Sequence, residues 1–251
     1  KSDQVRAEYP RLTIPYGSKP SEKMDVFAPA QTKDLPVMIF IHGGAWRHLS
    51  KEDSAGPAPS FVDSGVIYVA LDFDVIPKTD LPGMVSQCRE AIKYVSEHAR
   101  DFGGDPAKIF VSGHSSGGHL AAMMLTTDWK AQGAPADVLK GGVVLSGMGD
   151  LKGPMLSARG EYLKLNNKQI SEFSPLEHMS RVKVPVIVGW GGAESPEFVR
   201  QNKEMAEALA HEKKLYWQHE FANVDHYSVV NELNDPASAL FKKTLELIKS
   251  R

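Results

Sequence analysis

The sequence predicts an α/β fold with a mostly parallel central sheet and helices on both of its faces. Short apolar runs recur along the chain at residues 37–41, 66–71, 109–111, 142–145 and 184–188. Continuous apolar runs of this length are typical of strands that are covered on both faces, as in parallel sheets. Helix-like stretches lie between several of the runs, and strands that alternate with helices join into parallel sheets through right-handed crossovers.

Near its beginning the chain predicts an antiparallel hairpin at the edge of the sheet. Residues 12–16 and 23–28 alternate between apolar and polar side chains, and a Gly/Ser/Pro turn separates them. Apolar residues at helical spacing, among them Val85, Cys88 and Ile92, predict a helix over 83–100. The remaining expected elements are helices over 118–127, 197–211 and 236–249 and a last strand over 215–218.

Residues 151–181 fit neither a plain strand nor a plain helix. The segment is polar and contains Pro154, Pro175 and two consecutive asparagines. Two interpretations are open: a small cap over a site, or a long surface connection. No linker, charge block or internal repeat divides the chain, and 251 residues with 42% hydrophobic content can bury one sizeable core, so we expect a single domain over 1–251.

Composition and charge exclude several classes of function. The formal net charge is −2 with both signs dispersed and no basic stripe, so we expect no nucleic-acid partner. No apolar run approaches the length of a membrane span, and residues 1–10 lack the apolar core of a signal peptide, so we expect a cytoplasmic protein with no membrane partner. Cys88 is the single cysteine, which excludes an internal disulfide. No metal-ligand spacing is present, and we expect neither a metal nor a cofactor.

Residues 113–117, with the sequence GHSSG, are the most informative stretch. They lie between a strand-like run at 108–112 and a helix-like run at 118–127. This order indicates a nucleophile elbow, the strand–turn–helix that exposes a serine above the sheet of an α/β-hydrolase. The stretch therefore refines the fold class to the α/β-hydrolase fold.

The same elbow selects Ser115 over Ser116 as the nucleophile. The turn strains its central residue and leaves room only for small residues two positions away, which Gly113 and Gly117 satisfy for Ser115. Ser116 fails this test because His114 would stand two positions before it.

A second glycine cluster, HGGAW at residues 42–46, follows the apolar run 37–41. A hydrolase of this kind aims backbone N–H groups at the oxyanion of the tetrahedral intermediate. The fold places such a loop after its third strand and adds the amide of the residue after the nucleophile. The predicted oxyanion hole is therefore Gly43, Gly44 and Ser116, and the alternative is that both glycine clusters are ordinary tight turns.

The serine needs a base, which should follow it in the chain. His226 lies in a polar loop after the last expected strand and before the C-terminal helix, where a catalytic base belongs, and we choose it over a surface-histidine interpretation. The other four histidines after Ser115 lie in expected helices, in the last expected strand or in a polar segment elsewhere. They are His119, His178, His211 and His219.

The base needs an orienting carboxylate from just beyond a strand between the serine and the histidine. Glu194 is the first carboxylate after the strand expected at 184–188, and we predict it as the acid. Glu197 is the near competitor and Asp150 the distant one, whereas Asp225 adjoins His226 in sequence and is poorly placed to reach its ring.

Four stretches together carry a resemblance to a known family. They are HGGAW at 42–46, GHSSGGHLAA at 113–122, GGAESPEFVRQ at 191–201 and DHYS at 225–228. They resemble the kynurenine formamidase (arylformamidase) group of α/β-hydrolases, and the resemblance runs from about Tyr16 to the last helix. It implies hydrolysis of N-formyl-L-kynurenine to L-kynurenine and formate, in tryptophan catabolism. It also implies the catalytic residues Ser115, Glu194 and His226.

Three positions depart from the pattern of that group. Ala45 stands where a larger aromatic such as Tyr is frequent, Ser116 stands where alanine is usual, and Ala193 leaves Glu194 as the lone carboxylate there. These changes leave the chemistry intact and bear on the substrate. Because relatives of the group act on carboxylic esters, the alternative is a carboxylesterase for small or aryl esters with the same three residues.

The expected partner is a small-molecule amide or ester, and homodimerisation stays open. Trp46, at the mouth of the oxyanion loop, is a candidate to stack on an aromatic leaving group, with plain packing against the sheet as the equal alternative. Tyr227, beside the base, has the same two interpretations. For a charged amino-acid head the candidates by loop position are Arg47, His48 and Glu197.

Overall fold

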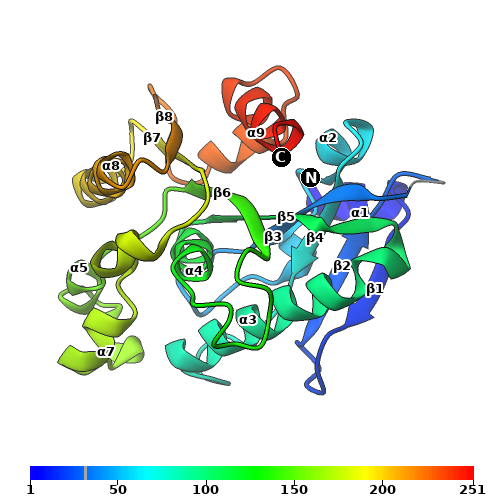
Figure 1. The fold of residues 1–251 in the computed structure, drawn as a ribbon. Coiled ribbons are helices and arrows are strands. Elements are labelled where there is room, and N and C mark those ends of the chain that lie inside the picture. The colour runs from blue at the N-terminus through cyan, green and yellow to red at the C-terminus, as the bar shows by residue number, and fades with distance from the viewer. Residues whose placement is uncertain (31–32) are drawn as a thin grey trace.

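In the computed structural model, which describes residues 1–30 and 33–251, eight strands form one sheet (Figure 1). The order across the sheet is β1-β2-β4-β3-β5-β6-β7-β8. The pairs β1–β2 and β2–β4 are antiparallel, and all pairs from β4–β3 to β7–β8 are parallel. The α/β-hydrolase prediction with its antiparallel edge hairpin is confirmed. The strands are β1 (Leu12–Pro15), β2 (Lys23–Phe27), β3 (Leu35–Ile41), β4 (Ile67–Leu71), β5 (Gly104–His114), β6 (Leu139–Leu145), β7 (Val186–Gly191) and β8 (Leu215–Phe221).

Helices cover both faces of the sheet (Figure 1). The described residues form α1 (Ser2–Glu8), α2 (Ala58–Asp63), α3 (Leu81–His98), α4 (Ser116–Leu125), α5 (Lys152–Met155), α6 (Gly160–Leu163), α7 (Asn167–Glu172), α8 (Pro196–His211) and α9 (Ala239–Lys249), together with the 3₁₀ turns η1 (Lys51–Ser54), η2 (Ala99–Phe102), η3 (Pro175–Arg181) and η4 (Val229–Leu233). The four longest helices match the four predicted ones. The sequence pattern missed α1 and α2, which are too short to show clear periodicity.

Successive side chains of β3 enter two different apolar layers. Val37, Ile39 and Ile41 pack on one face of the sheet with residues of α3, α4 and α8, whereas Met38 and Phe40 pack on the other face with residues of α1, α2 and α9. Because side chains alternate along a strand, a strand covered on both faces must be apolar throughout. This requirement explains the unbroken apolar run at 37–41.

Residues 151–181 form α5, α6, α7 and η3, joined by short turns. The segment is anchored by its apolar residues, since Leu163, Phe173 and Met179 are buried in the layer that also contains α4 and α8. Buried side chains therefore fasten this cap segment, residues 151–181, to the domain, and its role as a small cap over the site stays a prediction. No helix in residues 1–30 and 33–251 is long and apolar enough to cross a membrane.

Candidate active site

Ser115 occupies a strained turn between β5 and α4. Its φ of 59° and ψ of −124° lie outside the regions that L-residues ordinarily adopt. A Cβ on Gly113 would lie 2.1 Å from the carbonyl oxygen of Gly117, and a Cβ on Gly117 would lie 2.1 Å from the carbonyl oxygen of Ile41. The backbone segments of the elbow therefore approach each other so closely that only glycine fits at these two positions.

His226 connects Ser115 to Glu194. The imidazole Nε2 lies 2.8 Å from Ser115 Oγ, and Nδ1 lies 2.7 Å from Glu194 Oε2. An ionised carboxylate only accepts hydrogen bonds, so Nδ1 carries the proton and Nε2 is left to accept the serine hydroxyl. His226 comes from the loop after β8 and Glu194 from the turn after β7, so three predicted residues meet at one edge of the sheet.

The side chain of Glu194 is buried, and both of its carboxylate oxygens accept hydrogen bonds. Its Oε1 accepts the backbone N–H of Gly191 at 2.7 Å and the hydroxyl of Ser146. Burial by itself would raise the pKa of Glu194, but the hydrogen bonds from His226, Ser146 and Gly191 outweigh it, and the pKa lies below the ordinary value. The carboxylate is therefore ionised at neutral pH, which the orienting role predicted for it requires.

The competing carboxylates are engaged elsewhere. Glu197 binds Arg200 at 2.7 and 2.8 Å, and Asp225 accepts the backbone N–H groups of Tyr227 and Ser228. Asp150 accepts the backbone N–H of Lys152. None of these three carboxylates has a hydrogen bond to His226 among the described residues.

Two residues that support this arrangement were not singled out from the sequence. Ser146, at the end of β6, is buried with a φ of 44° and donates to Glu194. His114 donates from Nε2 to the backbone carbonyl of His226 at 2.7 Å and so fixes the loop that holds the base. Burial, followed by the nearby His226, lowers the pKa of His114 to about 4, so the ring is neutral at pH 7. The position of Ser146 beyond a strand end was the only signal that could have found either residue.

The glycine loop lies against the elbow. A Cβ on Gly43 would lie 2.8 Å from the carbonyl oxygen of His114 and 3.1 Å from Ser115 Cβ. Ser116 is the first residue of α4, so its N–H has no carbonyl one turn earlier to bind. Of the residues predicted for the oxyanion hole, Gly43 and Ser116 thus lie beside Ser115, and Gly44 follows Gly43 in the loop.

The two aromatic candidates occupy opposite environments. Trp46 is only 2% exposed, and its indole N–H donates to His119 Nδ1 at 3.3 Å, so its packing favours the structural alternative over stacking on a substrate. Tyr227 is 84% exposed and lies edge-on to the ring of His226, with 5.7 Å between the ring centroids. Of the two, Tyr227 alone presents an aromatic surface beside the base.

The stretch after Glu194 has a structural function that its sequence did not reveal. Gln201 Oε1 accepts the backbone N–H groups of Gly149 and Asp150 at 2.8 and 2.9 Å, and Asn202 donates to the carbonyl of Gly147. The stretch therefore fastens α8 to the loop that follows β6, next to Ser146. In the described parts of the chain, 1–30 and 33–251, no group of three or more His, Cys, Asp or Glu residues is suited to hold a metal ion.

Comparisons with known proteins show which family the chain belongs to. The profile of the BD-FAE family matches residues 24–231. The chain belongs to the BD-FAE family. It is also 34% identical over 244 residues to the kynurenine formamidase of Danio rerio, covering 94% of this chain and 81% of that protein. The chain therefore belongs to the same family as that enzyme and is a hydrolase.

Two further comparisons concern esterases. The carboxylesterase NlhH of Mycobacterium tuberculosis is 32% identical over 115 residues, which is 45% of this chain and 36% of that protein. The structure of an esterase from the Planctomycetes species Thermogutta terrifontis superposes with a TM-score of 0.76 at 22% identity, covering 96% of this chain and 92% of that one. The second likeness concerns the fold alone.

Proposed function

We propose that this protein is a serine hydrolase that cleaves an aryl formamide, N-formyl-L-kynurenine, to L-kynurenine and formate. The observation that carries the proposal is the continuous hydrogen-bonded series from Ser115 through His226 to Glu194, with distances of 2.8 and 2.7 Å. The choice of substrate rests on the similarity to the kynurenine formamidase of Danio rerio over nearly the whole chain.

In the proposed mechanism Ser115 Oγ attacks the formyl carbonyl while His226 Nε2 takes its proton. Glu194 holds the imidazole in the required tautomer and stabilises the imidazolium that forms. The oxyanion is stabilised by the amides of Gly43, Gly44 and Ser116. His226 then protonates the departing arylamine, and water, activated by the same imidazole, releases formate from the acyl-enzyme.

The second candidate is a carboxylesterase that acts on small or aryl esters with the same residues. It is favoured by the similarity to the carboxylesterase NlhH over 115 residues. Esters and formamides pass through the same kind of tetrahedral intermediate, so the catalytic geometry does not separate them.

A comparison of kcat/KM for N-formyl-L-kynurenine and p-nitrophenyl acetate decides between the two. We expect a strong preference for the formamide, and activity on the ester alone would replace this proposal by the second candidate. Ser115→Ala should lose orders of magnitude in kcat on either substrate. Ser96→Ala is the matched control, since it removes a serine hydroxyl that donates to the carbonyl of Lys93 on α3 and has no contact with the site residues. An unchanged rate in Ser115→Ala would refute a serine mechanism at this site.

A further inference from the structure

Three consecutive residues of the glycine loop have a left-handed backbone. The φ angles are 101° at Gly44, 53° at Ala45 and 60° at Trp46. Glycine adopts such angles freely, but Ala45 and Trp46 carry side chains that disfavour them. A backbone of this kind persists only where its surroundings hold it in place.

The peptide that joins Ala45 to Trp46 is held at both of its polar groups. The hydroxyl of Tyr162 donates to the carbonyl of Ala45 at 3.0 Å, and the N–H of Trp46 donates to the hydroxyl of Ser116 at 3.2 Å. These two groups belong to one planar unit, so the two hydrogen bonds together fix its orientation. One bond comes from α6 in the cap segment and the other from the elbow.

Neighbouring contacts anchor the rest of the loop. The carbonyl of Trp46 accepts the N–H of Ile76 at 2.9 Å, and its indole binds His119, whose Nε2 donates to the carbonyl of Phe173 at 2.8 Å. Phe173, like Tyr162, lies in the segment 151–181. The cap segment therefore reaches the glycine loop along two separate routes.

We propose that Tyr162 is a positioning residue for the oxyanion hole, which it stabilises by holding the Ala45–Trp46 peptide in place. The inference rests on the proposed oxyanion role of this loop. A rotation of that peptide would be passed through the Ala45 backbone to the amides of Gly43 and Gly44, which lie directly before it. The hydroxyl of Tyr162 binds the backbone carbonyl of Ala45 and does not contact the reacting atoms. Its loss should therefore affect transition-state stabilisation more than substrate binding.

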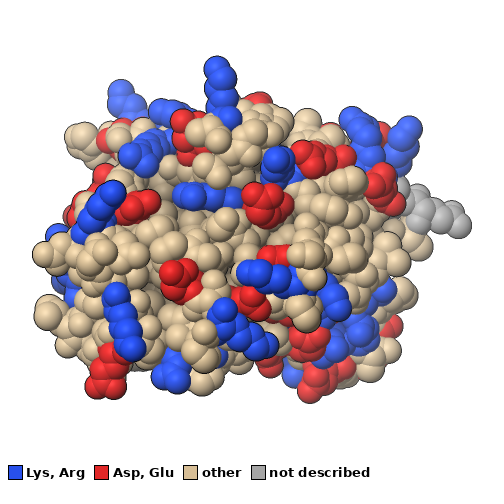
Figure 2. All heavy atoms as spheres, turned by 90° about the horizontal axis from the view of Figure 1, so that it is seen from below, with Lys and Arg blue, Asp and Glu red and all other residues tan. Residues whose placement is uncertain are grey.

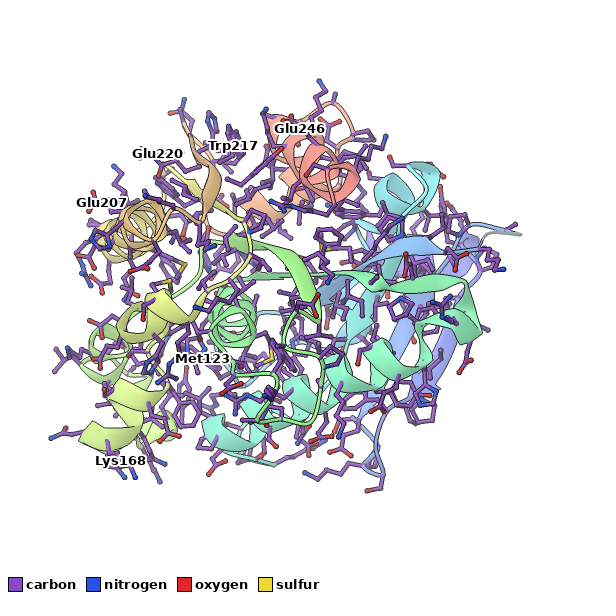
Figure 3. The ribbon with its side chains drawn as sticks, in the orientation of Figure 1. Met123, Lys168, Glu207, Trp217, Glu220 and Glu246 are labelled. Atoms are coloured by element: carbon purple, nitrogen blue, oxygen red, sulfur yellow. The ribbon has the colours of Figure 1, made fainter. Side chains whose placement is uncertain are left out.

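Tyr162→Phe isolates the hydroxyl. The ring and its contact with the guanidinium of Arg47, 4.7 Å from the ring centroid, are retained. Tyr216→Phe is the matched control, because its hydroxyl donates to Glu246 at 3.0 Å on the other side of the molecule. In Figure 3 Glu246 on α9 and Lys168 on α7 of the cap segment mark these two opposite sides.

The test uses p-nitrophenyl acetate and a trifluoromethyl ketone that mimics the tetrahedral intermediate. We expect Tyr162→Phe to lower kcat about tenfold, the effect of one hydrogen bond, with KM within about twofold. The inhibition constant of the ketone should rise by about the same factor as kcat/KM falls, and Tyr216→Phe should match the wild type. Unchanged kcat and inhibition constants, or a change confined to KM, would overturn the inference.

Ser116→Ala releases the same peptide from the opposite side while it keeps the Ser116 amide. The same split between kcat and KM is expected for it, and it decides the question if Tyr162→Phe does not fold. Labelling of wild-type Ser115 by a fluorophosphonate keeps the two proposals separate. Absence of labelling counts against the proposed function, whereas normal labelling with unaffected variants counts against the role of Tyr162 alone.

Discussion

At the scale of single residues, Glu194 illustrates how hydrogen bonds stabilise a buried charge. Three donors surround its carboxylate, namely His226, Ser146 and the N–H of Gly191. Hydrogen bonds to the charged form offset the cost of burying it, and they also fix which oxygen faces the imidazole.

Glu194→Gln should therefore lower kcat by roughly 10³- to 10⁴-fold while the fold is retained. An amide can present its NH₂ group to Nδ1, which stabilises the tautomer that cannot accept the proton of Ser115. Steady-state kinetics on p-nitrophenyl acetate measure the effect. Glu197→Gln, which alters a carboxylate three residues away that binds Arg200, is the control and should stay near the wild-type rate. A near-normal kcat in Glu194→Gln would show that another group orients the base.

The candidate nucleophile, acid and base could be proposed from the sequence because each follows a recognisable strand in a fixed order. The residues that support them could not. Ser146 binds Glu194 across 48 positions, His114 binds the carbonyl of His226 across 112, and Tyr162 binds Ala45 across 117. Such long-range hydrogen bonds depend on how the folded elements pack together, and no local sequence pattern predicts them.

At the scale of elements, the junction of β5 and α4 depends on close backbone contact. Gly117→Ala would place a methyl group 2.1 Å from the carbonyl of Ile41 and 2.4 Å from that of His42. Neither carbonyl can move without shifting the end of β3, so we expect the free energy of unfolding to fall by at least about 2–3 kcal/mol. Urea denaturation measures it.

Gly65→Ala is the comparison variant for that experiment. Gly65 has a φ of 79°, but a methyl group there would meet nothing within 4 Å. Its cost should be that of the backbone angle alone, about 1–2 kcal/mol. Equal losses in the two variants would contradict the argument from close packing.

The elements that could be predicted are those in which packing against the sheet imposes a regular pattern of apolar residues. Runs such as 37–41 are apolar because both faces are covered, and α3 and α8 have one apolar stripe because one side faces the sheet. Within 151–181 no helix exceeds seven residues, and buried positions such as Leu163 and Phe173 are widely spaced. Segments shorter than two helical turns carry too few positions to define a period.

At the scale of the whole molecule, charges of both signs mix over the face in Figure 2, which agrees with the small net charge. We expect the free energy of unfolding to depend on pH mainly through two histidines in the interior. Burial lowers the pKa of both His114 and His119 to about 4, in His114 with a further contribution from His226.

Between about pH 6.5 and 4 these two histidines are protonated in the unfolded chain but neutral in the folded protein. The stabilisation is therefore complete above pH 6.5 and is lost as the pH falls toward 4, by roughly 3 kcal/mol for each histidine. Urea unfolding at pH 7, 6 and 5 should show this decline. His119→Gln should remove about half of the decline, whereas His211→Gln, at an exposed site, should leave the decline as it is in the wild type. A flat profile in the wild type would mean that both rings can be protonated in place.

The order of elements along the chain also decides the order in which the residues of the site are synthesised. The elbow and the glycine loop are made first, Glu194 follows 79 positions after Ser115, and His226 comes another 32 positions later, beyond β8. A growing chain on the ribosome therefore carries Ser115, the proposed nucleophile, long before it carries His226, the proposed base. In the proposed mechanism hydrolytic turnover can begin only after the last strand has docked, so we expect the onset of activity during translation to report the completion of the sheet.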